Sequence, residues 1–316
     1  MIALVDCIIL SNNLINRKHK KMTKSFSMIC ALITTFIWGT AFIAQDTGMD
    51  NIGPLTFNMA RFFVGFLTIL PIALLFEQKK IKAEIKSNQK LFFKYLLFMG
   101  VSLFLGTYLQ QASLQYTNIA NAAFFTVFYV PLVPILLFFI YSKKVHWSIW
   151  SSIGLCVAGV YLLSDFSNSQ VMLGDALVIL CSVFWALHII YAGKFMEIFN
   201  IPMFYAALQA AFVGIVSLFF ASIFENIDLS NILLESYSII YAGVFSGGIA
   251  FTLQMYAQKN IEEAPAAIIY SLEGVFAAIA GWIILNQVLG FSNIVGCFLI
   301  LFAVLISQLV PQIKKN

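Results

Sequence analysis

Charged residues are scarce in this sequence, and their scarcity excludes most soluble proteins. Only 10% of the 316 residues are Asp, Glu, Lys or Arg, while 61% are hydrophobic. A soluble domain carries roughly 25% charged residues. So few charges cannot cover a water-facing surface, and so apolar a chain does not stay disordered. The composition therefore predicts an all-α integral membrane protein, in which each spanning helix needs about 20 mainly apolar residues.

Catalytic and metal-binding signatures are also missing. The five cysteines lie too far apart in sequence to form a metal-type C-x-x-C pair. The chain contains no H-E-x-x-H, G-x-S-x-G, phosphate-binding or dinucleotide-binding motif. The sequence therefore predicts no enzyme, no cofactor and no metal site. A basic run at 79–94 is interleaved with acids, which favours an orientation signal and lipid contact over binding of nucleic acid.

Ten apolar segments are predicted to be transmembrane helices, joined by short loops of which 77–90 is the longest. Before them, residues 1–21 hold a short apolar stretch and a basic cluster, which we interpret as an extension without function. The predicted spans are 26–45, 54–76, 91–114, 119–141, 147–164, 174–195, 202–224, 237–257, 265–285 and 290–310, with an amino-terminal extension at 1–25 and a tail at 311–316.

Lysine and arginine are distributed unevenly between the two sets of predicted loops. If the amino terminus is inside, 17 of the 18 basic residues lie in the inner loops and tails or at the span ends that adjoin them, and the remaining one, Arg61, lies farther inside a span. Basic residues collect in cytoplasmic loops. The distribution predicts a multi-pass protein of the cell (inner) membrane with both termini in the cytoplasm.

A weak internal repeat divides the predicted helices into two sets of five. Residues 109–123 share five identities with residues 253–267, which lie 144 positions later, and Trp38 and Trp185 lie at similar depth, 147 positions apart. Because five is odd, the two halves must have opposite orientations in the membrane. Inverted repeats of this kind place a substrate site near the middle of the bilayer, between the halves. The predicted halves are 26–164 and 174–310.

Four stretches of the sequence form a recognisable pattern. They are IWGTAFIAQ at 37–45, GPLTFNMARFFVG at 53–65, LQQASLQYTNIANAAFFTVFYVPLVP at 109–134 and YSLEGVFAAIAGW at 270–282. With them the chain resembles the drug/metabolite transporter superfamily, in its ten-span EamA-type branch, over about 26–310. The resemblance implies a secondary transporter, commonly an exporter, of small organic solutes. Gly274 departs from the family, which often has Pro after the glutamate of this span.

Two charged residues, Arg61 and Glu273, lie well inside the predicted spans. A charge at the bilayer centre costs roughly 2.5–3.5 kcal/mol on insertion scales, so such residues usually face a cavity or a partner. Arg61 would attract an anionic group of a solute, or alternatively bond polar groups of a neighbouring helix. Glu273 would load and release a proton, or alternatively be a packed and hydrogen-bonded glutamate. The sequence leaves both pairs of alternatives open.

Other residues within the spans complete the candidate site. His188, the only histidine inside a predicted span, is a second candidate for proton coupling, although a lone histidine on an apolar helix is more often a packing residue. Pro131 and Pro134 share one span, where they predict helix kinks. Tyr129 and Glu273 occupy matching repeat positions, so we expect them to face each other. The predicted substrate cavity consists of Trp38, Arg61, Gln110, Asn121, Tyr129, Trp185, Gln254 and Glu273.

These features predict a secondary active transporter of small metabolites, such as amino acids or related compounds, that works by alternating access. Export and the fold family rest on the resemblance, and proton coupling rests on Glu273 or His188. Two alternatives stay open: a membrane sensor or accessory subunit without transport, and an intramembrane enzyme that modifies lipids. The expected partners are a small-molecule solute and the lipid bilayer, with no nucleic acid, and the sequence does not determine the oligomeric state.

Overall fold

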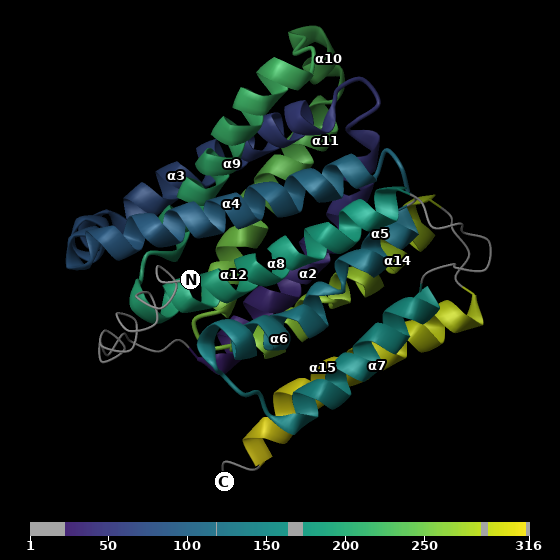
Figure 1. The fold of residues 1–316 in the computed structure, drawn as a ribbon. Coiled ribbons are helices and arrows are strands. Elements are labelled where there is room, and N and C mark those ends of the chain that lie inside the picture. Colours follow the sequence, from purple (N-terminus) through teal and green to yellow (C-terminus); the bar gives the residue numbers. More distant parts are fainter. Residues whose placement is uncertain (1–22, 118, 164–172, 286–289, 314–316) are drawn as a thin grey trace.

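Helices make up nearly all of the chain described by the computed structural model, and its described residues include no strand (Figure 1). These residues are 23–117, 119–163, 173–285 and 290–313. Most of the predicted extension 1–25 and half of the predicted tail 311–316 lie outside them. The helices are α2 (Lys24–Thr47), α3 (Pro54–Ser87), α4 (Gln89–Ser113), α5 (Ile119–Thr126), α6 (Tyr129–Tyr141), α7 (Trp147–Leu163), α8 (Leu173–Ile198), α9 (Pro202–Phe224), α10 (Leu229–Leu234), α11 (Ser236–Tyr241), the π-helical segment η2 (Ala242–Ala250), α12 (Phe251–Ala257), α13 (Glu263–Tyr270), α14 (Leu272–Leu285) and α15 (Phe291–Ile313).

The ten predicted spans correspond to ten apolar helical segments. Within the described residues, nine segments are long and apolar enough to cross a bilayer. The tenth, α7, is an apolar helix of 17 residues, or about 26 Å at 1.5 Å per residue. Three spans are built from consecutive helices: α5 with α6, α11 with η2 and α12, and α13 with α14. The prediction of an all-helical membrane protein is therefore confirmed.

The prediction of a loop at 77–90 is wrong, because helix α3 continues through most of this stretch to Ser87. This stretch consists largely of Lys, Glu, Gln and Ala, which are all strong helix formers. Its polarity therefore marks a helix that leaves the bilayer and does not mark a loop. Asn88 alone separates α3 from α4, and its side-chain oxygen accepts a hydrogen bond from the Leu91 N–H at 3.1 Å, which caps α4.

Helices α3 and α9, the second spans of the two halves, pack antiparallel and cap each other. The Glu77 carboxylate of α3 accepts hydrogen bonds from the backbone N–H groups of residues 203 and 204, at 3.2 and 2.9 Å. The Glu225 carboxylate after α9 accepts them from residues 55 and 56, at 2.9 and 2.8 Å. Each residue of one cap lies 148 positions from its counterpart. Two inverted halves produce this reciprocity, because each helix ends where the other begins.

The reciprocal caps are expected to stabilise the fold in equal measure. Glu77→Gln and Glu225→Gln should each lower the free energy of unfolding by about 1 kcal/mol, because a neutral amide loses its charge interaction with the helix N-terminus and one acceptor oxygen. Thermal melting of the purified protein measures the effect. Asp50→Asn, at an exposed acid near the same end as Glu225, is the matched control and should leave the melting temperature unchanged. Wild-type melting of both Gln variants would contradict the capping role.

Helices α7 and α15, the fifth spans, lie side by side as a pair at one side of the bundle (Figure 1). Gly159 and Gly296 bring their backbones together. A Cβ atom on Gly159 would lie 2.7 Å from the carbonyl oxygen of Gly296, and the reverse distance is 2.5 Å. Both distances are too short for a side chain, so the close packing of this pair requires glycine at both positions.

Candidate functional site

A cavity of about 520 Å³, its mouth included, lies between the two halves of the bundle. Its lining comes from α2, α3, α4, α5 and α6 in the first half and from α8, η2, α12, α13 and α14 in the second. Neither α7 nor α15 contributes to it. The lining residues are Trp38, Phe42, Gln45, Arg61, Thr107, Gln110, Thr126, Tyr129, Trp185, Ile189, Ser246, Phe251, Tyr270 and Glu273.

The cavity is displaced toward one end of the bundle. Gln45 and Gln110 lie in the last turn of α2 and α4, and Arg61 lies two turns into α3. We call this the acidic end, because Glu225 lies at the start of α3 and Glu235 contacts Asn51 in the loop before α3. The opposite end, which we call the basic end, holds Lys143, Lys194 and Lys259 together with the start of α2.

Six of the eight predicted cavity residues line the cavity: Trp38, Arg61, Gln110, Tyr129, Trp185 and Glu273. Gln254 is fully buried but does not line it, although it matches Gln110 in the repeat. Asn121 belongs to α5, and its side chain lies outside the described residues. The structure thus brings both intramembrane charges and both tryptophans to one site.

Arg61 is held by polar and aromatic neighbours and not by an acid. Its Nε donates to Asn58 Oδ1 and its Nη1 donates to Gln45 Oε1, both at 2.8 Å. The guanidinium also lies over the rings of Phe57 and Phe62, at 5.4 and 5.0 Å from their centroids. Arg61 is only 3% exposed, yet no described carboxylate lies within ion-pair distance of it. Its buried positive charge is therefore not neutralised by the described chain.

Both fourth spans are interrupted beside the cavity, at matching positions of the repeat. The first breaks at 127–128, between α5 and α6, and the second breaks 144 positions later at Ser271, between α13 and α14. In the first break, Pro131 lacks the N–H that would bond the carbonyl of residue 127 in an α-helix, and residue 130 bonds it instead. Pro134 lies inside α6. In the second break, the Ser271 hydroxyl donates to the Ile268 carbonyl at 2.6 Å.

Glu273 lies just after the second interruption and faces Tyr129, which follows the first. The Tyr129 hydroxyl donates to Glu273 Oε1 at 3.3 Å. Glu273 is 7% exposed, and no described lysine, arginine or histidine forms an ion pair with it. The cavity thus holds two buried groups of opposite formal charge that no ion pair joins in this structure, each beside neutral hydrogen-bonding partners.

Aromatic rings form the wall between these polar groups. The Trp38 ring lies 6.2 Å from the Trp185 ring and 5.5 Å from the Tyr270 ring, and Trp185 stacks on Phe251 at 6.2 Å. The Tyr270 hydroxyl is buried and has no hydrogen-bond partner among the described residues. A solute in the cavity would therefore meet flat apolar surfaces, which suit an apolar or aromatic body, and one free hydroxyl.

His188 lies behind this wall and does not line the cavity. It is fully buried, its Nε2 pairs with Gln209 Oε1 at 2.7 Å, and its ring packs edge-on against Trp185 and Phe251. His188 is therefore enclosed by packed side chains, and its part in proton coupling stays a prediction.

The sequence interpretation missed several polar lining residues. Gln45 falls in the IWGTAFIAQ stretch, and a glutamine inside an apolar span is a usable signal for a buried polar contact. Thr107, Thr126 and Ser246 carry no such signal, because serine and threonine are common in membrane helices and bond to their own backbone. The Thr126 hydroxyl, for example, donates to the Ala122 carbonyl of its own helix and accepts a hydrogen bond from Gln110 Nε2 at 3.1 Å.

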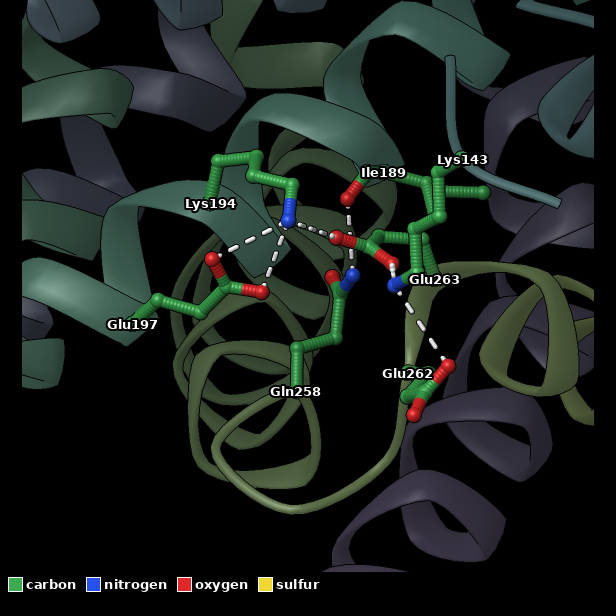
Figure 2. A network of polar contacts seen from close by, with 7 residues as sticks. All are labelled: Lys143, Ile189, Lys194, Glu197, Gln258, Glu262 and Glu263. Atoms are coloured by element: carbon green, nitrogen blue, oxygen red, sulfur yellow. Dashed lines mark hydrogen bonds and ion pairs between the residues drawn. The ribbon is translucent and has the colours of Figure 1, made fainter. Parts of the chain in front are cut away.

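An ionic network joins three parts of the chain at the basic end (Figure 2). Glu263, at the start of α13, pairs with Lys143 of the α6–α7 connection at 2.9 Å and with Lys194 of α8 at 3.3 Å. Lys194 also pairs with Glu197 within α8 at 2.8 Å, and Lys143 with Glu262 at 3.4 Å. The side chain of Glu263 is only 2% exposed, so it is the buried centre of the network.

Further contacts close the basic end around this network. Gln258 Nε2 donates to the Ile189 carbonyl at 2.7 Å (Figure 2), and Asn260 Nδ2 donates to Ser27 Oγ at 2.8 Å, which connects the α12–α13 loop with α8 and α2. Burial lowers the pKa of Lys143, but the neighbouring glutamates outweigh burial and leave it raised. Lys143 therefore stays charged at neutral pH, which preserves its ion pairs.

Glu263→Gln is expected to loosen the basic end. It removes both ion pairs that join α13 to other elements, whereas Glu197→Gln removes only a pair within α8 and is the matched control. A cysteine reporter at buried Ile261, in the α12–α13 loop and outside the cavity lining, should react with a maleimide at least about tenfold faster in the Glu263 variant, because 1.4 kcal/mol of closed-state stability corresponds to tenfold. The variant without the reporter gives the background. Equal labelling in both variants would mean that the network does not hold this end closed.

Comparison with known proteins places these features in context. The model of the EamA-like transporter family matches residues 25–165 and 172–309. An uncharacterized transporter of Archaeoglobus fulgidus is 30% identical over 277 residues, which are 88% of this chain and 84% of that protein. The uncharacterized inner membrane transporter YedA of Escherichia coli K12 is 23% identical, over 92% and 93% of the two chains. Among solved structures, a crystal structure of a protein that is 13% identical has the same fold, with a TM-score of 0.76; the match covers 93% of this chain and 100% of that one.

Proposed function

Because the chain belongs to the EamA-like transporter family, we propose that this membrane transporter carries a small zwitterionic metabolite, such as an amino acid or a related compound, by alternating access. The observation that carries the proposal is the pair of buried charges, Arg61 and Glu273, in one cavity without ionic partners. A buried charge without a partner is costly. A solute with an anionic and a cationic group would supply the missing ionic partner of Arg61 and that of Glu273.

The surroundings of Arg61 and Glu273 support the assignment of the anionic group to Arg61 and of the cationic group to Glu273. Arg61 is oriented by Asn58 and Gln45, so its remaining N–H groups suit a carboxylate, which arginine binds with two parallel hydrogen bonds. Glu273 suits an ammonium group or another donor. The aromatic wall of Trp38 and Trp185 would contact the apolar part of the solute.

Alternating access is supported by the unequal closure of the two ends. The cavity extends toward the acidic end, while the network around Glu263 ties α8, α13 and the α6–α7 connection together at the basic end. Opening toward the basic end would require this network to separate. The lysines at the basic end favour the cytoplasmic side for it, and for both termini, since basic residues collect there. Export is the direction that the resemblance to the superfamily favours.

Proton coupling is assigned to Glu273, which reaches the cavity, and not to His188, which does not. In this proposal the Glu273 carboxylate binds either a proton or the donor group of the solute. A proton taken from one side would therefore displace the solute, and the proton gradient would drive its movement.

Flux in proteoliposomes tests the proposal. The purified protein is reconstituted, a pH gradient is imposed, and movement of each member of a panel of radiolabelled amino acids is measured against protein-free vesicles. We expect gradient-dependent flux of at least one zwitterion, and no comparable flux of its decarboxylated amine, which lacks the group for Arg61. Absence of flux for every compound and gradient would favour a sensor or accessory subunit. Equal flux of the amine would refute the role given to Arg61.

A further inference from the structure

One half of the protein has an extension that the other half lacks. The capping residues Glu77 and Glu225 mark equivalent points of the two repeats. Helix α9 ends at Phe224, directly before its capping residue, but α3 continues past its own for ten more residues, to Ser87. The inverted fold therefore does not require the extension. It carries Lys79, Lys80, Lys82 and Lys86, and Lys90 follows at the start of α4; we call these five residues the lysine hairpin.

The extension separates its acids from Lys79, Lys82 and Lys86, whereas Lys80, three positions after Glu77 and four before Glu84, lies beside them. Glu77 and Glu84 follow buried Ala73 on one face of α3 and are themselves buried against the protein. Leu75 on the opposite face and Phe76 at its side are 80% and 73% exposed, which is the exposure of lipid-facing side chains. Residues three, four and seven positions apart share a face of a helix, and Lys79 and Lys82 follow Leu75 by four and seven positions.

Helix α4 repeats the arrangement in the opposite direction. Lys90 is exposed near its start, and Phe93 and Leu97, three and seven positions later, are 52% and 53% exposed. On both helices an exposed apolar stripe thus continues into exposed lysine. One helical turn advances about 5.4 Å, so the first lysines lie within one turn of the last lipid-facing side chains, at the depth of lipid headgroups.

None of the five lysines forms an ion pair with a described carboxylate. The acids nearest to them in sequence point inward, and Glu77 is occupied as the cap of α9. Apart from the Coulombic attraction between Lys80 and Glu77, the lysine hairpin is therefore a concentrated positive charge that no ion pair of the described chain neutralises. Clusters of four to eight basic residues beside a transmembrane helix attract anionic lipids, at about 1 kcal/mol for each residue.

We propose that the lysine hairpin binds the headgroups of anionic phospholipids in the leaflet at the basic end. An apolar stripe that continues into lysine on both helices fits a lipid, whose acyl chains would follow the exposed Phe76 and Phe93 while its phosphate meets the ammonium groups. A soluble acidic protein would pair with the lysines but would not cover the exposed apolar side chains that adjoin them. Bound lipid would hold the α3–α4 connection against the membrane surface.

Native mass spectrometry of the full chain tests this proposal. The purified protein is incubated with equal amounts of phosphatidylglycerol and phosphatidylethanolamine that carry the same acyl chains, and the ratio of the two bound lipids is measured. The test variant carries K79Q, K82Q, K86Q and K90Q. A second variant carries Arg at the same four positions, and Lys144→Gln, at an exposed lysine between α6 and α7 at the same end, is the control.

We expect the wild type to prefer phosphatidylglycerol and the Gln variant to lose at least about tenfold of that preference, because each of the four lysines near an anionic surface is worth up to roughly fivefold in affinity. The Arg variant and Lys144→Gln should keep it, and added salt should weaken it. A folded Gln variant with the wild-type preference would overturn the proposal and leave the lysines as an orientation signal. A wild type without any preference for phosphatidylglycerol would overturn it as well.

Discussion

Glu273→Gln is expected to abolish the response of transport to a pH gradient while the protein stays folded. Glutamine keeps the shape of the side chain and can still accept the hydrogen bond from Tyr129, but it cannot take up or release a proton. Flux of the zwitterion identified in proteoliposomes should therefore become independent of the gradient and fall at least about tenfold, the ratio that corresponds to 1.4 kcal/mol. Melting curves of the variant establish that it is folded.

Tyr129→Phe is the matched control for this experiment. It removes the 3.3 Å hydrogen bond, which the Gln variant can keep, but leaves the carboxyl group in place. Its flux should fall while the response to the gradient remains. If the Gln variant of Glu273 retains the wild-type dependence on pH, the residue has no part in proton coupling and is a packed glutamate.

Arg61→Lys should impair transport more than conservation of the positive charge would suggest. Lysine keeps the charge but not the planar fork that bonds Asn58, Gln45 and the solute at once. Loss of a hydrogen bond to a charged group costs about 1.5–3 kcal/mol, so the apparent affinity for the solute should fall roughly tenfold to a hundredfold. The concentration dependence of flux measures this change.

Two further variants define the role of Arg61. Asn58→Ala removes one residue that orients the guanidinium but leaves the guanidinium itself, so it should lower the affinity for the solute less than Arg61→Lys does. Arg61→Gln removes the charge altogether and should be at least as impaired as the Lys variant. Wild-type affinity in Arg61→Lys would show that only a point charge is needed, and wild-type affinity in Arg61→Gln would remove the residue from the solute site.

The charged residues of the site were predictable because charge is rare in membrane helices. Arg61 and Glu273 are conspicuous in spans that otherwise hold apolar residues, and the repeat offset of 144 positions predicts the contact between Tyr129 and Glu273 that the structure contains. The uncharged members could not be separated in this way. Gln110 and Gln254 have the same residue type and the same repeat position, yet only Gln110 lines the cavity, because the rotation of each helix is set by its packing and not by its own sequence.

Contacts between segments far apart in the sequence could not be predicted from the sequence either. The Glu77 cap joins residues 126 and 127 positions apart, and the Glu225 cap joins residues 169 and 170 positions apart. Glu77 reads as one more charge in a polar stretch, which led to the wrong prediction of a loop at 77–90. The same holds for Glu263, whose partners Lys143 and Lys194 lie in separate elements.

The sequence by itself determined that this chain is an all-helical membrane protein of two inverted halves, because hydrophobic run length and periodic repetition depend only on local composition and order. The tertiary structure decided which polar side chains share a cavity, where the fourth spans break beside it, and which end of the bundle is tied closed. Those outcomes depend on the rotation and crossing of ten helices against one another. Helix faces that are almost uniformly apolar do not encode that arrangement in any single segment.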